Sequence, residues 1–167
     1  MWAYESVFYQ VYPLGFTGAP FENDGELRHG ILRFIDWIPH IRKVGANAIY
    51  FSPVFESDTH GYNTRDYKKI DVRLGTNEDF KKVCDELHKN DIKVVLDGVF
   101  NHTGSNSRYF NKYGEYDSVG AYQSKESPYY TWFRFMDWPD VYESWWGMTT
   151  LPQIEDCLLY TSDAADD

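Results

Sequence analysis

The feature that most constrains this chain is an alternation of strand and helix patterns over residues 6–97. Apolar residues recur at helical spacing over residues 31–41 and again over residues 76–90. Short runs of β-branched, aromatic and other apolar residues predict strands before, between and after these helices, at residues 6–12, 47–52 and 93–100. Strands that are joined through helices run parallel, with right-handed crossovers. The pattern therefore predicts an α/β fold built from successive β/α units.

Local signals refine these elements. Thr76 or Asn77 caps the second helix, and Glu78 and Asp79 fall in its first turn, where the helix dipole favours anions. Pro39 lies inside the first helical pattern and should kink that helix or mark its first turn. The third strand has no polar alternation, so we expect it to be buried.

Two architectures use successive parallel β/α units, namely the doubly wound open sheet and the (β/α)8 barrel. No glycine-rich phosphate-binding motif follows any of the strands, so nucleotide-binding versions of the open sheet lose support. The segments after the strands are long, polar and aromatic, which favours the barrel. A barrel takes roughly 250 residues, and this 167-residue chain supplies only three of the eight strands. We therefore expect an α/β chain that forms the first three β/α units of an incomplete (β/α)8 TIM barrel, with an exposed last strand.

The composition changes along the chain and predicts three regions. Residues 1–102 carry the β/α pattern and form the N-terminal part of the barrel. Residues 103–156 are rich in aromatic residues, glycine and serine without clear periodicity, which predicts an insertion after the third strand. Residues 157–167 (CLLYTSDAADD) continue neither pattern. Their small and acidic residues predict a non-native or disordered tail, and the string resembles a translated sequencing adapter.

Charge and composition exclude several classes of protein. The formal net charge is −10, with 16 basic and 26 acidic residues, whereas a nucleic-acid binder needs a basic surface. There is no apolar run of 18 or more residues, so we expect no membrane span. The first residues show no signal-peptide pattern, and two cysteines cannot form a disulfide framework. These features predict a cytoplasmic protein.

Polar residues that could carry chemistry follow the second and third strands. Asp97 and His102 bracket the sequence DGVFNH, at the strand end where barrel active sites lie. Asp97 could equally cap local backbone amides. Residues 60–67 (HGYNTRDY) follow the second strand, and the flexible glycine there allows a turn that exposes Tyr62. An adjacent arginine and aspartate in that segment could equally be a solvated pair.

Aromatic residues make up 19% of the chain, and fourteen of them lie between residues 109 and 146. Core packing explains most such rings, because aromatic side chains dominate buried area. A wall of flat faces with polar edges would also suit a ligand that has both C–H faces and hydroxyl groups, which describes a sugar. Composition alone leaves both interpretations open.

Four segments together resemble glycoside hydrolase family 13, the α-amylase family. They are VFYQVYPLGF, VGANAIYFSPVFES, HGYNTRDY and DGVFNH, which begin at residues 7, 44, 60 and 97. Their order and spacing fit the family's first three β/α units, and the resemblance covers residues 5–156. Residues 103–155 resemble the start of the family's domain B, and LPQIE at residues 151–155 lies where a short motif closes it. The chain is most similar to the neopullulanase, cyclomaltodextrinase and maltogenic-amylase branch.

The resemblance implies roles for individual residues. Tyr62 would stack on the sugar at the cleavage site, and His102 would donate a hydrogen bond to a hydroxyl of that sugar. Asp97 would be a buried residue that orients the loop after the third strand. Asn101 matches a position that binds structural calcium in many α-amylases, and no other cofactor is implied. Asn63 departs from the family, which usually has aspartate there.

The resemblance also implies that no catalytic residue lies within this chain. Retaining glycoside hydrolysis needs two carboxyl groups about 5–5.5 Å apart. In this family the nucleophile, the acid/base and a third carboxylate arise from strands four, five and seven. We therefore expect the N-terminal fragment of a retaining hydrolase that acts on α-1,4-glucosidic bonds of starch, maltooligosaccharides or cyclodextrins, the fragment itself being inactive.

Other interpretations remain open at this point. One is a non-catalytic carbohydrate-binding α/β domain that uses the aromatic residues between positions 132 and 146. A second is a transglycosylating or isomerising member of the same family. A third is a small flavodoxin-like α/β domain without catalysis.

Overall fold

The computed structural model describes residues 2–155, so the tail expected at residues 157–167 lies outside the described residues. The chain divides into two compact units. Unit 1 comprises the described residues up to 61 together with residues 67–98, and unit 2 comprises residues 62–66 and the described residues from 99 onward. Within residues 2–155, no helix has the length and apolar character needed to cross a bilayer.

Three parallel strands form the sheet of unit 1. They lie in the order β1–β2–β5, with the bounds β1 (Phe8–Val11), β2 (Ala48–Phe51) and β5 (Lys93–Leu96). Tyr9 pairs with Ile49, and Ile49 pairs with Val94, both in parallel register. The parallel β/α units predicted from the sequence are therefore confirmed.

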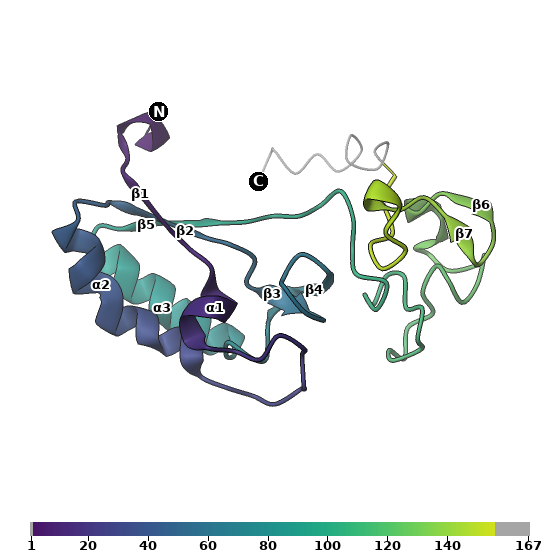
Figure 1. Cartoon of the computed structure of the whole chain (residues 1–167), viewed down its shortest axis with the longest axis horizontal. Helices are drawn as coiled ribbons and strands as arrows, with labels where there is room; N and C mark the ends of the chain where they lie inside the picture. Colours follow the sequence, from purple (N-terminus) through teal and green to yellow (C-terminus); the bar gives the residue numbers. More distant parts are fainter. Residues whose placement is uncertain (1, 156–167) are drawn as a thin grey trace. The chain divides into compact units, whose positions relative to one another are not determined.

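Two helices connect these strands and lie on the same side of the sheet (Figure 1). They are α2 (Arg33–Lys43) and α3 (Asn77–Lys89). Of the two caps that the sequence allows, Thr76 is the one that caps α3, and it forms a capping box with Asp79. Pro39 lies inside α2, so the alternative that it marks the first turn is wrong.

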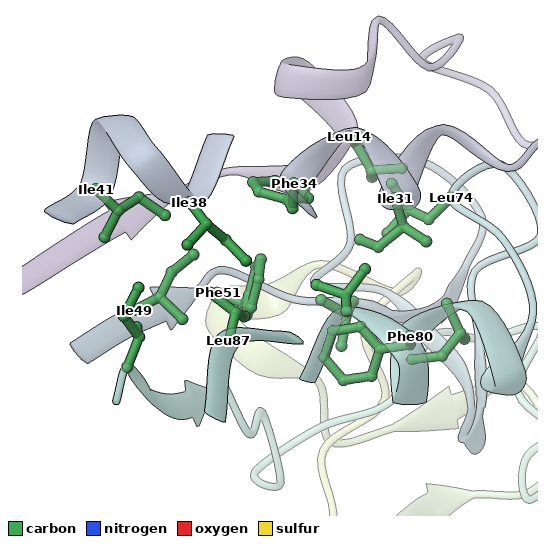
Figure 2. Close-up of a cluster of buried hydrophobic side chains, with 14 of the residues drawn as sticks. Leu14, Ile31, Phe34, Ile38, Ile41, Ile49, Phe51, Leu74, Phe80 and Leu87 are labelled. Carbon is green, nitrogen blue, oxygen red and sulfur yellow. The ribbon is translucent and has the colours of Figure 1, made fainter. Parts of the chain in front are cut away.

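The core of unit 1 lies between the helices and the sheet. Each helix buries one stripe, since Phe34, Ile38 and Ile41 are spaced by one helical turn along α2. In Figure 2 these side chains and those of α3 converge on Ile49 and Phe51 of β2. The Phe34 and Phe51 rings meet edge to face, with centroids 5.1 Å apart.

The structure differs from the sequence prediction in two places. The third strand ends at Leu96 instead of residue 100, and its two end residues are exposed. It is less buried than expected because, among the described residues, β5 is an edge strand and the helices cover one face of the sheet. The long polar segment after the second predicted strand contains the paired strands β3 (Phe55–Ser57) and β4 (Thr64–Ile70), which the sequence did not predict.

The other short elements of the first 61 residues do not alter this arrangement. They are the 3-10 helices η1 (Trp2–Glu5) and η2 (Gly30–Leu32), and the one-turn helix α1 (Pro13–Thr17). Helix α1 begins at a proline and ends at Gly18 in the left-handed conformation (φ 71°).

Unit 2 contains little regular structure. Its short elements are η3 (Tyr130–Trp132), β6 (Phe135–Asp137), β7 (Val141–Tyr142) and η4 (Trp145–Gly147), and β6 pairs with β7 in antiparallel fashion. Its described core is a small cluster of four buried residues, Phe110, Ala121, Phe133 and Tyr142. Phe110 lies at the centre, since its ring contacts those of Tyr122, Phe133, Phe135 and Tyr142.

Candidate functional site

The short segment 62–66 packs against residues 103–108 within unit 2. The Gly104 amide donates to the Thr64 carbonyl at 2.9 Å, which places the two backbones side by side. A Cβ atom at Gly104 would lie 2.7 Å from the Asn63 carbonyl oxygen, so only glycine fits at this position. This close backbone contact brings the segment after the second strand of the sheet to the segment after the third.

Tyr62 and His102 are thereby brought together. His102 is buried, at 4% exposure, and its Nε2 lies 3.0 Å from the Tyr62 carbonyl oxygen. A carbonyl can only accept, so Nε2 carries the proton and donates this hydrogen bond. The Tyr62 residue remains 40% exposed. It follows Gly61, whose φ of +97° allows the turn that the sequence predicts.

The LPQIE segment positions the backbone of His102. The Thr103 amide donates to the Pro152 carbonyl at 3.1 Å, and the Ile154 amide donates to the Asn101 carbonyl at 3.0 Å. His102 and Gln153 thus form an antiparallel β-bridge. The sequence singled out LPQIE as a motif, but it gave no sign that the motif pairs with residues 101–103.

Sequence reasoning missed a second neighbour of His102. The Trp145 ring lies against the imidazole, with centroids 5.2 Å apart and planes tilted by 31°. The tryptophan pair followed by Gly147 indicates large rings on a tight turn, but this pattern does not show which residue the rings contact.

Ion pairs hold the segment 62–66 in place. Asp66 accepts from Arg108 at 3.1 Å, and Arg65 donates to Glu115 at 2.5 Å. The side chains of Arg65 and Asp66 are 19% and 14% exposed. These two residues are therefore not a solvated pair on a free loop, and they tie the segment that carries Tyr62 to the rest of unit 2.

Asp97 belongs to unit 1, unlike Tyr62 and His102. It follows β5 directly, and its backbone amide donates to the Phe51 carbonyl at 2.9 Å. Asp97 is only partly buried in the described structure. Two of the three predicted sugar-site residues therefore share a unit, and the orienting role of Asp97 stays a prediction.

The predicted calcium role of Asn101 finds no supporting donor set. Calcium takes six to eight oxygen ligands, with carboxylates prominent among them. Asn101 is exposed, and residues 2–155 contain no group of three or more His, Cys, Asp or Glu side chains that could hold a metal ion. The calcium role of Asn101 therefore stays a prediction, and we assign no step to it.

Burial shifts the pKa of two titratable groups, His60 in unit 1 and Tyr109 in unit 2. Burial, followed by the positive charge of Arg73, lowers the pKa of His60, so its imidazole is neutral at pH 7. Burial, followed by the carboxylate of Asp66, raises the pKa of Tyr109, so its phenol stays protonated. Neither group therefore supplies a charge near pH 7.

Comparison with known proteins gives a consistent family. The family described as alpha amylase, catalytic domain, matches residues 10–152. The amylopullulanase of Thermoanaerobacterium thermosulfurigenes is 45% identical over 127 residues, covering 72% of this chain. The maltogenic alpha-amylase of Bacillus acidopullulyticus is 35% identical over 158 residues, covering 85% of this chain. The chain spans only 7% and 26% of the lengths of these two relatives.

The fold agrees with solved structures of the same kind. Cyclic alpha-maltosyl-(1→6)-maltose hydrolase from Arthrobacter globiformis, in complex with maltose, matches with a TM-score of 0.74 and 30% identity. The match covers 92% of this chain and 38% of that protein. It confirms the predicted fold class of a partial TIM barrel, while the boundaries at residues 102 and 156 stay predictions. From the family match, the relatives and the fold together, this chain belongs to the α-amylase family, within its catalytic domain.

Proposed function

We propose that the full-length protein containing this chain is a retaining glycoside hydrolase that cleaves α-glucosidic bonds of starch, maltooligosaccharides or cyclodextrins. The observation that carries the proposal is the 3.0 Å hydrogen bond from His102 Nε2 to the Tyr62 carbonyl oxygen, in a member of the α-amylase family. The family resemblance assigns sugar contact to both residues. Relatives named amylopullulanase, cyclomaltodextrinase and maltogenic alpha-amylase support the same substrate class.

In this proposal Tyr62 and His102 bind one sugar unit by different chemistry. The partly exposed ring of Tyr62 packs on the C–H face of the sugar. His102 already uses its Nε2 proton on the Tyr62 carbonyl. A sugar hydroxyl therefore receives that hydrogen bond only by sharing or replacing the carbonyl. A sugar hydroxyl that binds to His102 therefore changes the hydrogen bonding of the Tyr62 backbone.

We further propose that the 167-residue chain alone binds glucan without hydrolysing it. The reaction needs a nucleophile and an acid/base carboxyl about 5–5.5 Å apart. The family resemblance assigns both to later strands of the barrel, and the chain covers a minor part of its relatives' length. This chain would supply sugar binding at Tyr62 and His102 and orientation of the adjoining loop through Asp97.

The test is an assay of the full-length protein on maltohexaose, cyclodextrin and pullulan, with the product anomers followed by NMR. The expected result is hydrolysis with the α-anomer released first, and no turnover by the 167-residue chain. Tyr62→Ala should lower kcat/KM by about 100-fold, and Tyr62→Phe should keep most activity because it keeps the ring. Longer oligosaccharide products would favour the transglycosylating alternative. No turnover of any α-glucan would overturn the proposal.

A second candidate function is sugar binding without chemistry. Trp145 and the exposed Trp146 form a stacked pair, an arrangement that suits a sugar face. Binding of maltohexaose by a full-length protein that releases no product would favour this function over hydrolysis.

A further inference from the structure

Trp146 is the most exposed tryptophan among the described residues, at 85% exposure. It also has φ 52° and ψ 29°, a left-handed conformation that large residues adopt rarely. Tryptophan is a highly buried residue on average, because its large apolar surface favours removal from water. Within the described residues a large ring is thus exposed in an unfavourable backbone conformation, which is a reason to look for function at this position.

The turn that carries Trp146 is firmly held. The Trp145 amide donates to the Leu151 carbonyl at 2.9 Å and closes the turn. The hydroxyl of the buried Tyr142 donates to the Thr149 carbonyl at 2.7 Å. Leu151 is itself buried, at 4% exposure. The turn therefore holds the exposed ring in a fixed position, which lowers the conformational entropy lost when a ligand binds to it.

Trp146 also continues the row of rings that starts at His102. The Trp145 and Trp146 rings are stacked, with centroids 5.1 Å apart and planes 17° from parallel. The Trp145 ring also lies 5.2 Å from the His102 ring. The distance between the ring centroids of His102 and Trp146 is therefore at most the sum of these two distances. A linear polymer that is bound at His102 and extends along these rings would reach Trp146.

We propose that Trp146 is a platform for a second glucose unit of the same α-glucan chain, beyond the unit bound at Tyr62 and His102. The inference rests on the function proposed above and adds a determinant of chain-length preference to it. A glucose ring has a face of C–H groups that packs on an indole, while its hydroxyls stay in water at the rim. The continuity with His102 selects a glucan over a protein partner as the occupant.

Two substitutions separate this role from a structural one. Trp146→Gly removes the ring and relieves the left-handed conformation, since glycine adopts positive φ freely. Trp146→Phe keeps an aromatic face at the same position. If the ring only stabilised the turn, the glycine variant would bind glucan as well as the natural protein does. Tyr113→Ala serves as a control, because Tyr113 is another exposed ring of unit 2, at 60% exposure.

The measurement is KM for maltohexaose and for 4-nitrophenyl α-glucoside, which has a single glucose unit, in the full-length protein. In Trp146→Gly the KM for maltohexaose divided by the KM for the single-unit substrate should rise about tenfold, the factor that ~1.4 kcal/mol of lost contact produces. In Trp146→Phe the ratio should change by less than about threefold, and in Tyr113→Ala it should not change. An unchanged ratio in Trp146→Gly, or an equal rise in both KM values, would overturn the inference.

The same variants distinguish failure of this inference from failure of the proposed function. If the full-length protein hydrolyses no α-glucan, the proposed function fails. Calorimetric titration with maltohexaose then tests separately whether Trp146 contacts the glucan. About tenfold weaker binding in Trp146→Gly, with normal binding in Tyr113→Ala, still supports it. Equal binding by all variants, or no binding by the natural protein, contradicts it.

Discussion

Unit 1 buries side chains that helices and strands present at regular spacing, whereas unit 2 is built around a few aromatic rings on irregular backbone. The described core of unit 1 contains fifteen buried apolar residues, and that of unit 2 contains four. Unit 2 also buries many polar residues, among them Thr103, Ser105, Asn106, Ser107 and Asn111. Apart from the β6–β7 pair, its backbone is held by loop-to-loop hydrogen bonds.

This difference teaches where each unit is vulnerable. In unit 1 the loss of one core side chain leaves many neighbours that still pack together. In unit 2 more of the described ring contacts involve Phe110 than any other side chain, so a single substitution there removes the centre of the cluster. The site residues Tyr62 and His102 lie in the unit with the smaller core.

The largest expected effect comes from removing a buried ring from the core of either unit. Phe110→Ala and Phe34→Ala each remove a fully buried ring and should cost about 3–5 kcal/mol. Phe110→Ala should abolish the protection of the Ala121 and Tyr122 amides, which bond to carbonyls 109 and 110, and leave the sheet of unit 1 protected. Hydrogen exchange read residue by residue checks this. Equal loss of protection in both units would break the comparison.

The second prediction concerns a buried ion pair that gives unit 1 a weak point of its own. Arg73 and Asp71 are fully buried and bonded at 2.7 Å, and Arg73 also donates to the Phe21 carbonyl. Arg73→Met leaves the Asp71 carboxylate buried without its charged partner and should cost about 3 kcal/mol. The double variant Asp71→Leu/Arg73→Met should regain part of that loss, as measured by denaturant unfolding. If the double variant lost more free energy of unfolding than the two single variants lose together, this account would be contradicted.

A smaller effect is expected at the N-terminus of α3. The Thr76 hydroxyl accepts from the Asp79 amide at 3.1 Å. Thr76→Ala should therefore lower the stability of unit 1 by about 1 kcal/mol, and Thr76→Ser should retain most of it. Thermal unfolding of the two variants provides the measurement. A loss of the same size in both would show that the capping hydroxyl is not the cause.

The smallest expected effect is a pH dependence confined to unit 1. Burial opposes ionisation of Asp79, but hydrogen bonds from the Thr76 backbone and from the His29 ring outweigh it and hold the pKa of Asp79 below its ordinary value of 3.8. The stabilisation is thus complete above 3.8 and is lost as pH falls through the lower pKa of the folded state. Asp79→Asn should flatten the acid limb of the stability profile. An unchanged acid limb would rule out Asp79 as its source.

The sequence predicted unit 1 well because periodicity reports burial in regular elements. Helix α3, a cap at Thr76 or Asn77 and the parallel direction of the strands all followed from spacing and local chemistry. The shortened third strand did not, because an apolar run does not reveal whether both faces of a strand are covered. The strands β3 and β4 were missed because their polar residues resemble a loop.

The site was predictable as a set of residues but not as a geometry. Motif resemblance pointed to Tyr62 and His102, and the structure brings them together. No local pattern could show that Trp145 lies against His102, or that Gly104 contacts the Asn63 carbonyl. Such contacts depend on how irregular segments pack, and irregular segments carry no period from which packing can be predicted.

The central claim is that the glucan binds to unit 2, whose backbone is irregular, and not to the β/α core of unit 1. The most direct test is hydrogen exchange of the full-length protein with and without saturating maltohexaose. The account predicts new protection at residues 62–66, 101–104 and 144–148, with the amides of β1, β2 and α2 unchanged. Protection confined to the sheet and helices of unit 1, or no change anywhere in this chain, would contradict it.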